Sequence, residues 1–182
     1  MKKTLIINGS PRINGDSAAL ISELRRHLEG AVIELSAFRS DIAPCMDCRR
    51  CWDSAVCAVR DDMDIIYADD YDNVVLAAPV YFSMLPGAVI SLVSRFQPQH
   101  CAFRLGLPFM SRQKKAGLLL VSGGSGNEAG VERQVGLFFK LFNASGFEEH
   151  RAVSLNTDTL PAKDDQAALD AVADLALWLN SD

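Results

Sequence analysis

Short apolar runs and amphipathic stretches follow one another along the chain. Five of the runs are rich in Val, Ile, Leu and Ala, and turn-forming residues stand beside them, which is typical of buried β-strands. The predicted strands are 4–9, 31–38, 73–82, the first part of 115–127, and 149–155.

Apolar residues between these runs recur at helical spacing. Leu20 and Leu24 lie on the apolar face of a helix predicted over 16–29, and Asp16 or Ser17 is available to cap its first turn. A further helix is expected to stop at Gly146, since glycine suits a helix end. The other predicted helices cover 61–71, 86–96, 128–146 and 164–179.

The alternation of strands and helices indicates the fold class. Nearly continuous apolar strands are typical of a parallel sheet that helices cover on both faces. We therefore predict an α/β three-layer sandwich with a five-stranded parallel sheet. The 182 residues suit one domain, and no repeat or linker interrupts them. We expect a single domain over 1–182, with a cysteine-rich loop at 44–58.

The composition of the chain indicates which binding partners are unfavourable. The net charge is −5 and the pI about 5.2, which argues against nucleic-acid and anionic-membrane binding. No apolar run approaches the roughly 20 residues of a membrane span. The apolar run near the start, 5–7, is too short for a signal peptide. We therefore expect a cytoplasmic location, where structural disulfides are disfavoured.

The loop after the first strand, with the sequence GSPRINGDS, predicts a phosphate site. Asp16 stands where a Walker loop needs lysine, and the dinucleotide pattern G-x-G-x-x-G is missing. The loop instead offers Ser10, Arg12, Asn14 and Ser17 around a helix start. Hydroxyls, backbone N–H groups and one guanidinium are enough to bind a phosphate monoester without a metal.

Two more loops are expected at the same edge of the sheet. The third strand ends in 79–83, a proline followed by Val80, Tyr81, Phe82 and Ser83, and the fourth runs into the glycine-rich 122–127. Each loop alone is compatible with ordinary packing or with a turn. Together with the first loop, they predict a site for a phosphate and a flat ring.

Four cysteines follow the spacing C-x2-C-x2-C-x5-C, at Cys45, Cys48, Cys51 and Cys57. The first three repeat the rhythm of bacterial ferredoxin motifs, in which thiolates hold a [4Fe–4S] cluster. Structural zinc sites more often use two separated pairs of ligands. A cluster is the favoured interpretation; bare thiols, zinc and disulfides are the alternatives. Cys101 lies outside this run and is predicted to be a partly buried thiol.

The chain resembles the flavodoxin-like NAD(P)H-dependent FMN reductases, and within them the iron–sulfur flavoproteins. The resemblance rests on 9–17, 44–63, 78–87 and 122–126. It implies a flavodoxin-like fold with one FMN per subunit. The implied phosphate contacts are Ser10, Arg12, Asn14, Gly15 and Ser17. The implied ring contacts are Pro79, Val80, Tyr81, Phe82, Ser83, Gly123 and Gly124.

The resemblance also implies the chemistry. FMN supplies the redox step, so no side chain is required as a catalytic acid or base. A nicotinamide cofactor, NAD(P)H, or a ferredoxin-like carrier is the expected electron partner, and a homodimer or homotetramer the expected assembly. One alternative is a non-catalytic protein whose four cysteines bind zinc or sense redox state. A nucleotide-phosphate enzyme is disfavoured by the missing lysine.

Overall fold

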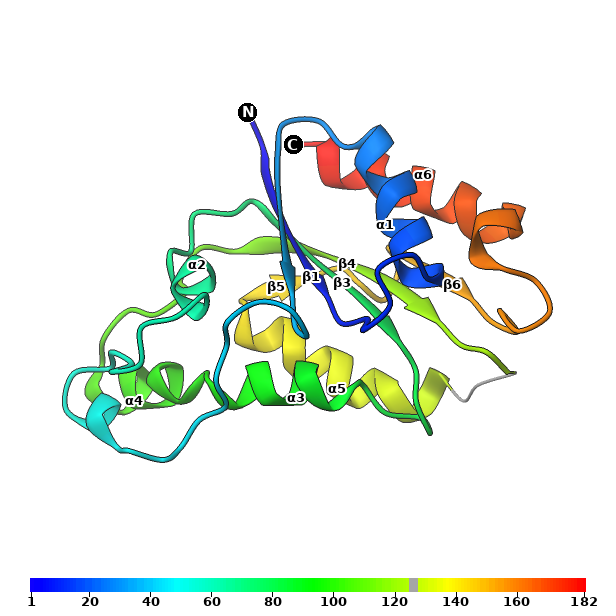
Figure 1. Cartoon of the computed structure of the whole chain (residues 1–182). Helices are drawn as coiled ribbons and strands as arrows, with labels where there is room; N and C mark the ends of the chain where they lie inside the picture. Colours follow the sequence, from blue (N-terminus) through cyan, green and yellow to red (C-terminus); the bar gives the residue numbers. More distant parts are fainter. Residues whose placement is uncertain (125–127) are drawn as a thin grey trace.

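The computed structural model describes residues 1–124 and 128–182. Its strands form one parallel sheet in the order β2-β1-β3-β4-β5, with β6 also paired to β4 (Figure 1). The strands are β1 Lys3–Asn8, β2 Ala31–Ser36, β3 Asn73–Pro79, β4 Lys114–Val121, β5 Ala144–Ser145 and β6 Arg151–Ser154.

The fifth position of the sheet is divided between two short strands. β5 pairs with Lys114 and Lys115 at the start of β4, and β6 pairs with 118–121 at its end. The predicted five-stranded parallel sheet is confirmed, because these two segments together occupy one edge. The predicted strand 149–155 corresponds to β6.

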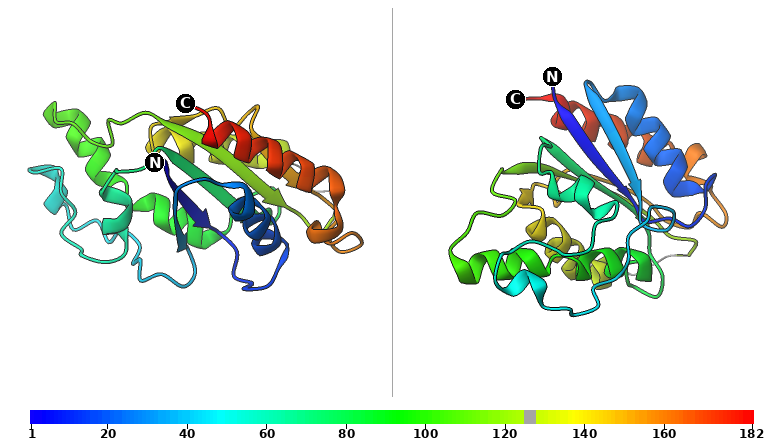
Figure 2. Two further views of the ribbon diagram at one scale, coloured as in Figure 1. Left: turned by 90° about the horizontal axis from the view of Figure 1, so that it is seen from above. Right: turned by 60° about the vertical axis from the view of Figure 1, so that its left-hand side comes forward.

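Helices cover both faces of the sheet, as Figures 1 and 2 show. α1 and α6 lie on one face, and α2, α3 and α5 on the other. α4 and the cysteine-rich segment, 44–60, extend past the sheet together. The helices are α1 Asp16–His27, α2 Met63–Tyr67, α3 Gly87–Ser94, α4 Gln97–Leu105, α5 Glu128–Leu141 and α6 Gln166–Asn180, with 3-10 turns η1 Arg50–Trp52 and η2 Ala162–Asp164.

Strand alternation divides the core into two layers. Leu5 and Ile7 of β1 are buried under α2, α3 and α5, whereas Ile6 between them is buried under α1 and α6. Successive side chains of a strand point to opposite faces, so a strand buried on both faces is apolar throughout. This explains why the strand runs show no polar alternation.

Helix α5 ends earlier than the sequence indicates. The predicted helix 128–146 stops at Leu141, and 144–145 form β5 instead. Asn143 adopts a left-handed conformation with φ 52°, and its side-chain amide donates to the Ser111 carbonyl at 2.9 Å. A left-handed residue ends a helix as glycine would, so the stop signal is Asn143 rather than Gly146.

Helix α4 is absent from the sequence prediction, which ends its helix at residue 96. The structure has α3 over 87–94 and then a second helix, with Pro98 in its first turn and Gly106 as a left-handed cap with φ 66°. Its nine residues are too few for a clear periodicity.

No helix in the described part of the chain is both long and apolar enough to cross a membrane. The expected cytoplasmic location and the single-domain organisation stay predictions.

Candidate functional site

A cavity of about 260 Å³ lies at the carboxyl ends of β1, β3 and β4. β1 pairs with β2 on one side and with β3 on the other, so the strand order reverses there, where open α/β sheets bind ligands. The cavity is lined by Ser10, Arg12, Asp16, Ser17, Pro79, Val80, Tyr81, Val121, Ser122, Gly123, Thr157 and Asp158.

The loop after β1 begins at Gly9, beside helix α3. A Cβ there would lie 2.7 Å from the Val89 side chain, so the close approach of loop and helix α3 requires glycine. The side chain of Asn8 then accepts from the backbone N–H of Ser10 at 3.0 Å, and the Ser10 hydroxyl accepts from the N–H of Arg12 at 3.2 Å. The loop is therefore held in shape before any ligand binds.

The start of α1 differs from the predicted cap. The N-cap position is Gly15, and neither Asp16 nor Ser17 caps the helix through its side chain. Asp16 instead accepts from the backbone N–H of Ala162 at 2.9 Å. The buried Ser17 hydroxyl has no hydrogen-bond partner within the described residues. A buried hydroxyl at a helix N-terminus, on the wall of a cavity, is matched to an anion.

The loop after β3 is a tight hairpin turn. Tyr81 and Met84 exchange backbone hydrogen bonds of 3.0 Å, and Phe82 and Ser83 between them have φ 50° and 60°. Tyr81 is partly exposed and Phe82 is 96% exposed. The backbone N–H of Val80 donates to the carbonyl of Val121, the last residue of β4, at 2.8 Å, so the turn is anchored to the sheet.

Residues from the loop after β6 complete the cavity, and the sequence reasoning missed them. The carboxylate oxygens of Asp158 lie 2.8 Å from where a Cβ on Gly123 would stand, so Gly123 is needed beside it. Thr157 donates its backbone N–H to the Ser122 carbonyl at 2.9 Å. The sequence could have indicated these residues only through their position after a predicted strand. A loop that follows another parallel strand reaches the same edge of the sheet.

The structure brings some of the predicted FMN contacts to one wall and not others. Those that line the cavity are Ser10, Arg12, Ser17, Pro79, Val80, Tyr81 and Gly123. Those that do not are Asn14, Gly15, Phe82, Ser83 and Gly124. The remaining residues of the glycine-rich loop, Ser125, Gly126 and Asn127, lie outside the described residues.

The four cysteines of the run line one small cavity of about 30 Å³. Cys45 and Cys48 are exposed, and Cys51 and Cys57 are partly buried. Within residues 1–124 and 128–182, no three Cys, His, Asp or Glu side chains converge closely enough to hold a metal ion. Four thiols are the ligands that an iron–sulfur cluster requires, and all four line the same cavity. Their sulfur atoms are not arranged in a coordination geometry in this structure.

The buried side chain of Arg95, between α3 and α4, binds residues at both ends of the cysteine-rich segment. It is 1% exposed, pairs with Asp61 at 2.5 Å, and donates to the carbonyls of Ala43 and Val59 at 2.9 and 3.3 Å. It also donates to the Cys57 sulfur at 3.4 Å. One guanidinium thus joins both ends of the segment, a role the sequence reasoning assigned to no residue.

The same contacts lower the pKa of the Asp61 carboxyl group. Burial alone raises the pKa of a carboxyl group, but hydrogen bonds from Arg95 and from two backbone N–H groups outweigh it, so the pKa of Asp61 lies below its ordinary value. The sequence reasoning placed Asp61 at a helix start without chemistry. The local sequence could not predict this role, because the partner of Asp61, Arg95, is 34 residues away.

Cys101 is almost fully buried rather than partly buried, with 2% exposure. Its sulfur lies 3.7 Å from the sulfur of Cys51. Burial raises the pKa of the Cys51 thiol to about 11, and Cys101 adds to the increase. Without a bound metal, Cys51 is therefore a protonated thiol near neutral pH.

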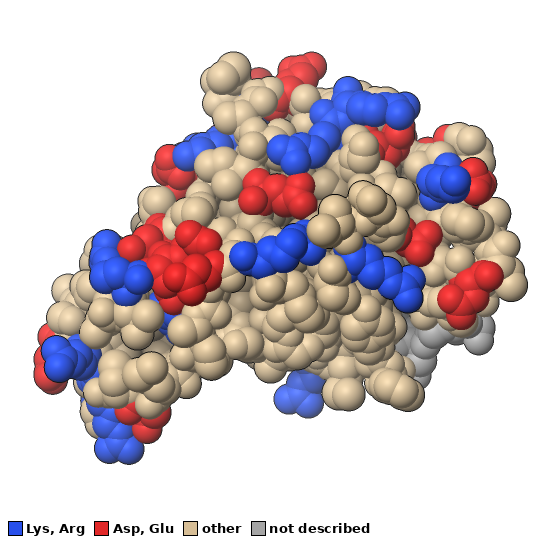
Figure 3. All heavy atoms as spheres, in the orientation of Figure 1, with Lys and Arg blue, Asp and Glu red and all other residues tan. Residues whose placement is uncertain are grey.

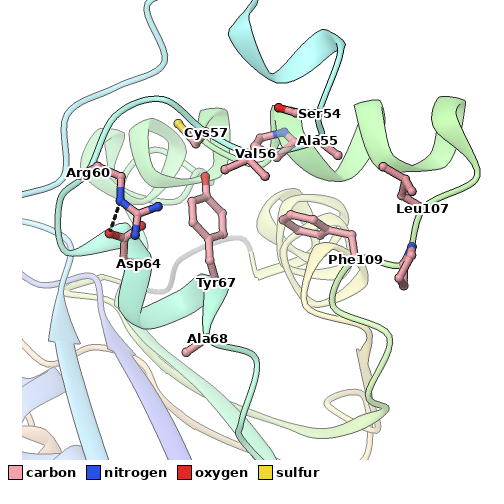
Figure 4. A pocket seen from close by; sticks show the side chains of 12 residues that line it. Ser54, Ala55, Val56, Cys57, Arg60, Asp64, Tyr67, Ala68, Leu107 and Phe109 are labelled. Carbon is pink, nitrogen blue, oxygen red and sulfur yellow. Dashed lines mark ion pairs between the residues drawn. The ribbon is translucent and has the colours of Figure 1, made fainter.

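A larger cavity of about 490 Å³ lies beside the cysteine-rich segment (Figure 4). Tyr67 and Phe109 point into it, Cys57 lies at its rim, and Arg60 and Asp64 form an ion pair of 3.0 Å at one side. Cys57 lines both this cavity and the smaller one. Burial and the nearby Cys57 raise the pKa of the Tyr67 hydroxyl, so it remains protonated.

Relatives of known sequence include two archaeal proteins. An iron–sulfur flavoprotein of Methanocaldococcus jannaschii is 28% identical over 145 residues, which cover 76% of this chain and 72% of that protein. An iron–sulfur flavoprotein of Methanosarcina thermophila is 32% identical over 136 residues, which cover 71% of this chain and 66% of that protein.

A similar solved structure is the FMN-dependent NADH-azoreductase of Bacillus anthracis in complex with FMN. It has a TM-score of 0.65 and 12% identity, and the match covers 100% of both chains. This likeness supports the flavodoxin-like fold. The family model described as NADPH-dependent FMN reductase matches residues 2–154. Since that match spans most of the sequence, the chain belongs to the NADPH-dependent FMN reductase family, whose members are flavin-dependent oxidoreductases.

Proposed function

We propose that the protein binds FMN in the cavity between β1, β3 and β4 and acts as a flavin-dependent reductase. The observation that carries the proposal is the Ser17 hydroxyl, which is buried on the cavity wall without a partner among the described residues. A phosphate oxygen would satisfy it, because the helix N-terminus favours an anion at this point.

The loop after β1 is the proposed phosphate end. Ser10, Arg12 and Ser17 contribute two hydroxyls and a guanidinium from the cavity wall. Asn14 and Gly15 do not line the cavity, and they are expected to contribute through the backbone N–H groups of the loop. Asp16 holds the neighbouring loop through the N–H of Ala162, which gives its carboxylate a partner other than the ligand.

The proposed ring end lies between the turn after β3 and the loop after β4. Pro79, Val80 and Tyr81 from the turn and Gly123 from the glycine-rich loop all line the cavity. Phe82, Ser83 and Gly124 are assigned to the rim, where the turn and the glycine-rich loop end. The bound flavin would accept a hydride as a pair of electrons; the chain binds it, orients it and limits water access.

The electron donor is proposed to be NAD(P)H. The name of the matching family supports a nicotinamide donor, and so does the name of the azoreductase with the same fold. A small acceptor, such as a quinone or a second flavin, would then receive the electrons.

We further propose that the cysteine-rich segment holds a [4Fe–4S] cluster through Cys45, Cys48, Cys51 and Cys57. Both archaeal relatives are named iron–sulfur flavoproteins, and the four thiols line one cavity. Arg95 would offset the charge of the thiolates, since its guanidinium already donates to the Cys57 sulfur. With a cluster present, a ferredoxin-like carrier is the proposed electron partner.

A homodimer or homotetramer is the proposed assembly. Tyr81, Phe82, Met84 and Ile90 are exposed apolar side chains around the turn and helix α3. α3 contains no charged residue, and the lower middle of Figure 3 accordingly shows few Lys, Arg, Asp or Glu side chains. An uncharged apolar surface of this kind is typical of an interface.

The test is an absorption spectrum of anaerobically purified protein, with iron and acid-labile sulfide measured on the same sample. Flavin bands, broad iron–thiolate absorption and about four irons per chain are the expected result. Flavin bands without iron would reject the cluster and leave an FMN reductase with free thiols. Zinc or free thiols without flavin would favour the non-catalytic zinc-binding or redox-sensing alternative.

A further inference from the structure

The fifth cysteine of the chain lies against the four-cysteine run. Cys101 belongs to α4 and Cys51 to η1, and although they are 50 residues apart in sequence their sulfur atoms are 3.7 Å apart. Cys101 is buried, whereas Cys51 is partly exposed. A pair in which one thiol can be reached from solvent and the other is held behind it is suited to thiol–disulfide exchange.

Packing holds the two segments together. Cys101 is buried with Ala55 and Ala102, and Cys51 and Phe109 pack against this cluster. Trp52 follows Cys51 in the chain. The guanidinium of Arg104, a residue of α4, lies 5.5 Å from the centroid of the Trp52 ring. The proximity of the two sulfurs is therefore a property of the α4–η1 contact.

We propose that Cys51 and Cys101 form a reversible disulfide, which makes them a redox modification site. A disulfide bond is about 2.05 Å long, so the sulfurs must approach by roughly 1.7 Å. Rotation about the side-chain bonds of Cys51 can supply most of this movement, because Cys51 lies in a short 3-10 turn and is partly exposed. Cys57 is engaged differently, as the acceptor of a hydrogen bond from Arg95.

The oxidant is a low-molecular-weight disulfide such as glutathione disulfide. Cys51 loses its proton to solvent, and its thiolate attacks one sulfur of the glutathione disulfide. The disulfide bond of glutathione breaks, one glutathione leaves and takes up a proton, and a mixed disulfide remains on Cys51. The Cys101 sulfur then attacks the Cys51 sulfur, loses its proton and releases the second glutathione thiol. Two protein thiols are oxidised and one glutathione disulfide is reduced to two thiols, so atoms and electrons balance.

The disulfide would also control the proposed cluster, and this part rests on the proposed function. Cys51 is one of the four proposed cluster ligands, and a sulfur bonded to Cys101 cannot ligate iron as a thiolate. Disulfide and complete cluster therefore exclude each other. Oxidation would keep the protein in a cluster-free form until a reductant frees Cys51.

Peptide mapping tests the disulfide directly. The full chain is freed of iron with a chelator, reduced, exchanged into glutathione disulfide and blocked with an alkylating reagent. Trypsin should then yield a linked pair of peptides, 51–60 and 96–104, which dithiothreitol separates. Fragmentation of the pair distinguishes Cys51 from Cys57. A chain in which Cys101 stays alkylated, or in which Cys45 and Cys48 alone become linked, overturns the proposal.

Two variants provide matched controls. Cys101→Ser should abolish the linked peptide pair, while Cys48→Ser, which removes an exposed thiol of the same run, should leave its yield unchanged. A yield that also falls in Cys48→Ser would mean that Cys48 is needed for the linkage, which contradicts direct pairing of Cys51 with Cys101. Far-UV circular dichroism of each variant verifies that it is folded.

Anaerobic reconstitution with iron and sulfide tests the exclusion. The reduced wild type should take up about four irons per chain, and the oxidised wild type less than a tenth of that until dithiothreitol is added. Oxidised Cys101→Ser keeps the mixed disulfide with glutathione at Cys51, so this variant is compared in its reduced form, in which it should take up as much iron as the reduced wild type. Equal uptake by oxidised and reduced wild type overturns the exclusion. If the reduced protein takes up no iron, the cluster proposal fails, and the peptide map still decides the disulfide.

Discussion

At the scale of single residues, Arg12 carries the cationic part of the proposed phosphate site. It is the one basic side chain among the described residues that line the cavity, while Asp16 and Asp158 contribute two carboxylates. A phosphate bound here therefore depends on the Arg12 guanidinium and on hydroxyl and backbone donors.

Replacing Arg12 by alanine should weaken FMN binding by roughly 10- to 100-fold, because a hydrogen bond to a charged group contributes about 1.5–3 kcal/mol. Riboflavin lacks the phosphate, so its affinity should change far less. Fluorescence titration of the apoprotein with both flavins measures the difference. Arg26→Ala, on the exposed side of α1, is the control. Equal losses for both flavins would reject the assigned role.

Asp61 is expected to be the most sensitive carboxylate for stability. Asp61→Asn leaves the buried Arg95 charge without its partner, which should lower the free energy of unfolding at neutral pH by about 3–5 kcal/mol. Urea unfolding measures this loss. The more exposed Asp64, paired with Arg60, is the control, and its Asn variant should lose about 1 kcal/mol or less.

The pH dependence of that loss follows from the lowered pKa of Asp61. A carboxyl group whose pKa is lower in the folded chain adds stability above its unfolded pKa of about 3.9, and this stability disappears as pH falls through the folded pKa. The difference between wild type and Asp61→Asn should therefore be constant near neutral pH and shrink below about pH 4. A difference that stays constant into strong acid would contradict the assignment.

At the scale of elements, the turn between β3 and α3 holds two residues in an unfavourable conformation. Phe82 and Ser83 both have positive φ, and Phe82 gains no burial in return. Turns of this shape favour Asn-Gly, because those residues adopt left-handed conformations at little cost. Such strain at the rim of a site is compatible with a role in presenting backbone groups to a ligand.

Replacing Phe82 and Ser83 together by Asn and Gly should raise the free energy of unfolding by about 2–4 kcal/mol, since roughly 1–2 kcal/mol is lost for each of the two left-handed residues. Urea unfolding of the apoprotein measures the gain. Phe82→Ala keeps a left-handed residue with a Cβ and should give little or none. A double variant less stable than the wild type would mean that the turn conformation is not strained.

Elements were predictable from the sequence where their pattern is long and local. β1 and β3 are nearly continuous apolar runs, and α1 and α6 have clear helical periods, so their positions agree with the prediction to within three residues. α4 and β5 are short and were missed. The helix end at Asn143 was assigned to Gly146 because glycine is the usual left-handed residue, although asparagine serves the same purpose.

The site was predictable only in its local part. The loops after β1, β3 and β4 have distinctive residues, and topology brings them together. The loop with Thr157 and Asp158 has no such residues, and it joins the cavity through tertiary structure alone. Arg95 and Cys101 were missed as partners of the cysteine run because the contacts join segments at least 34 residues apart.

At the scale of the whole molecule, the sheet needs a helix that lies beyond the matched family region. The family match ends at residue 154, whereas α6 spans 166–180. Val172, Leu175 and Leu179 of α6 are buried against the sheet and α1. The carboxyl-terminal helix is thus part of the core even though it contributes no residue to the proposed site.

Truncation to residues 1–160 should abolish cooperative unfolding. Burial of a Val or Leu side chain contributes about 1.5–3 kcal/mol, so three of them approach the 5–15 kcal/mol that typically stabilises a domain. Urea unfolding followed by circular dichroism measures the effect. Residues 1–180, which retain the helix, should keep a cooperative transition. A cooperative 1–160 fragment would show that α6 is not needed for the core.

Helix α3 joins the two proposed redox regions of the subunit. It begins three residues after the turn at Met84 and ends at Ser94, whose hydroxyl accepts from the backbone N–H of Cys45 at 3.0 Å. Eight residues at 1.5 Å each make it about 12 Å long. The length of α3 therefore contributes to the separation between the proposed flavin site and the proposed cluster site of one subunit. Because tunnelling slows steeply with distance, a longer or shorter α3 would change the rate of the proposed electron transfer.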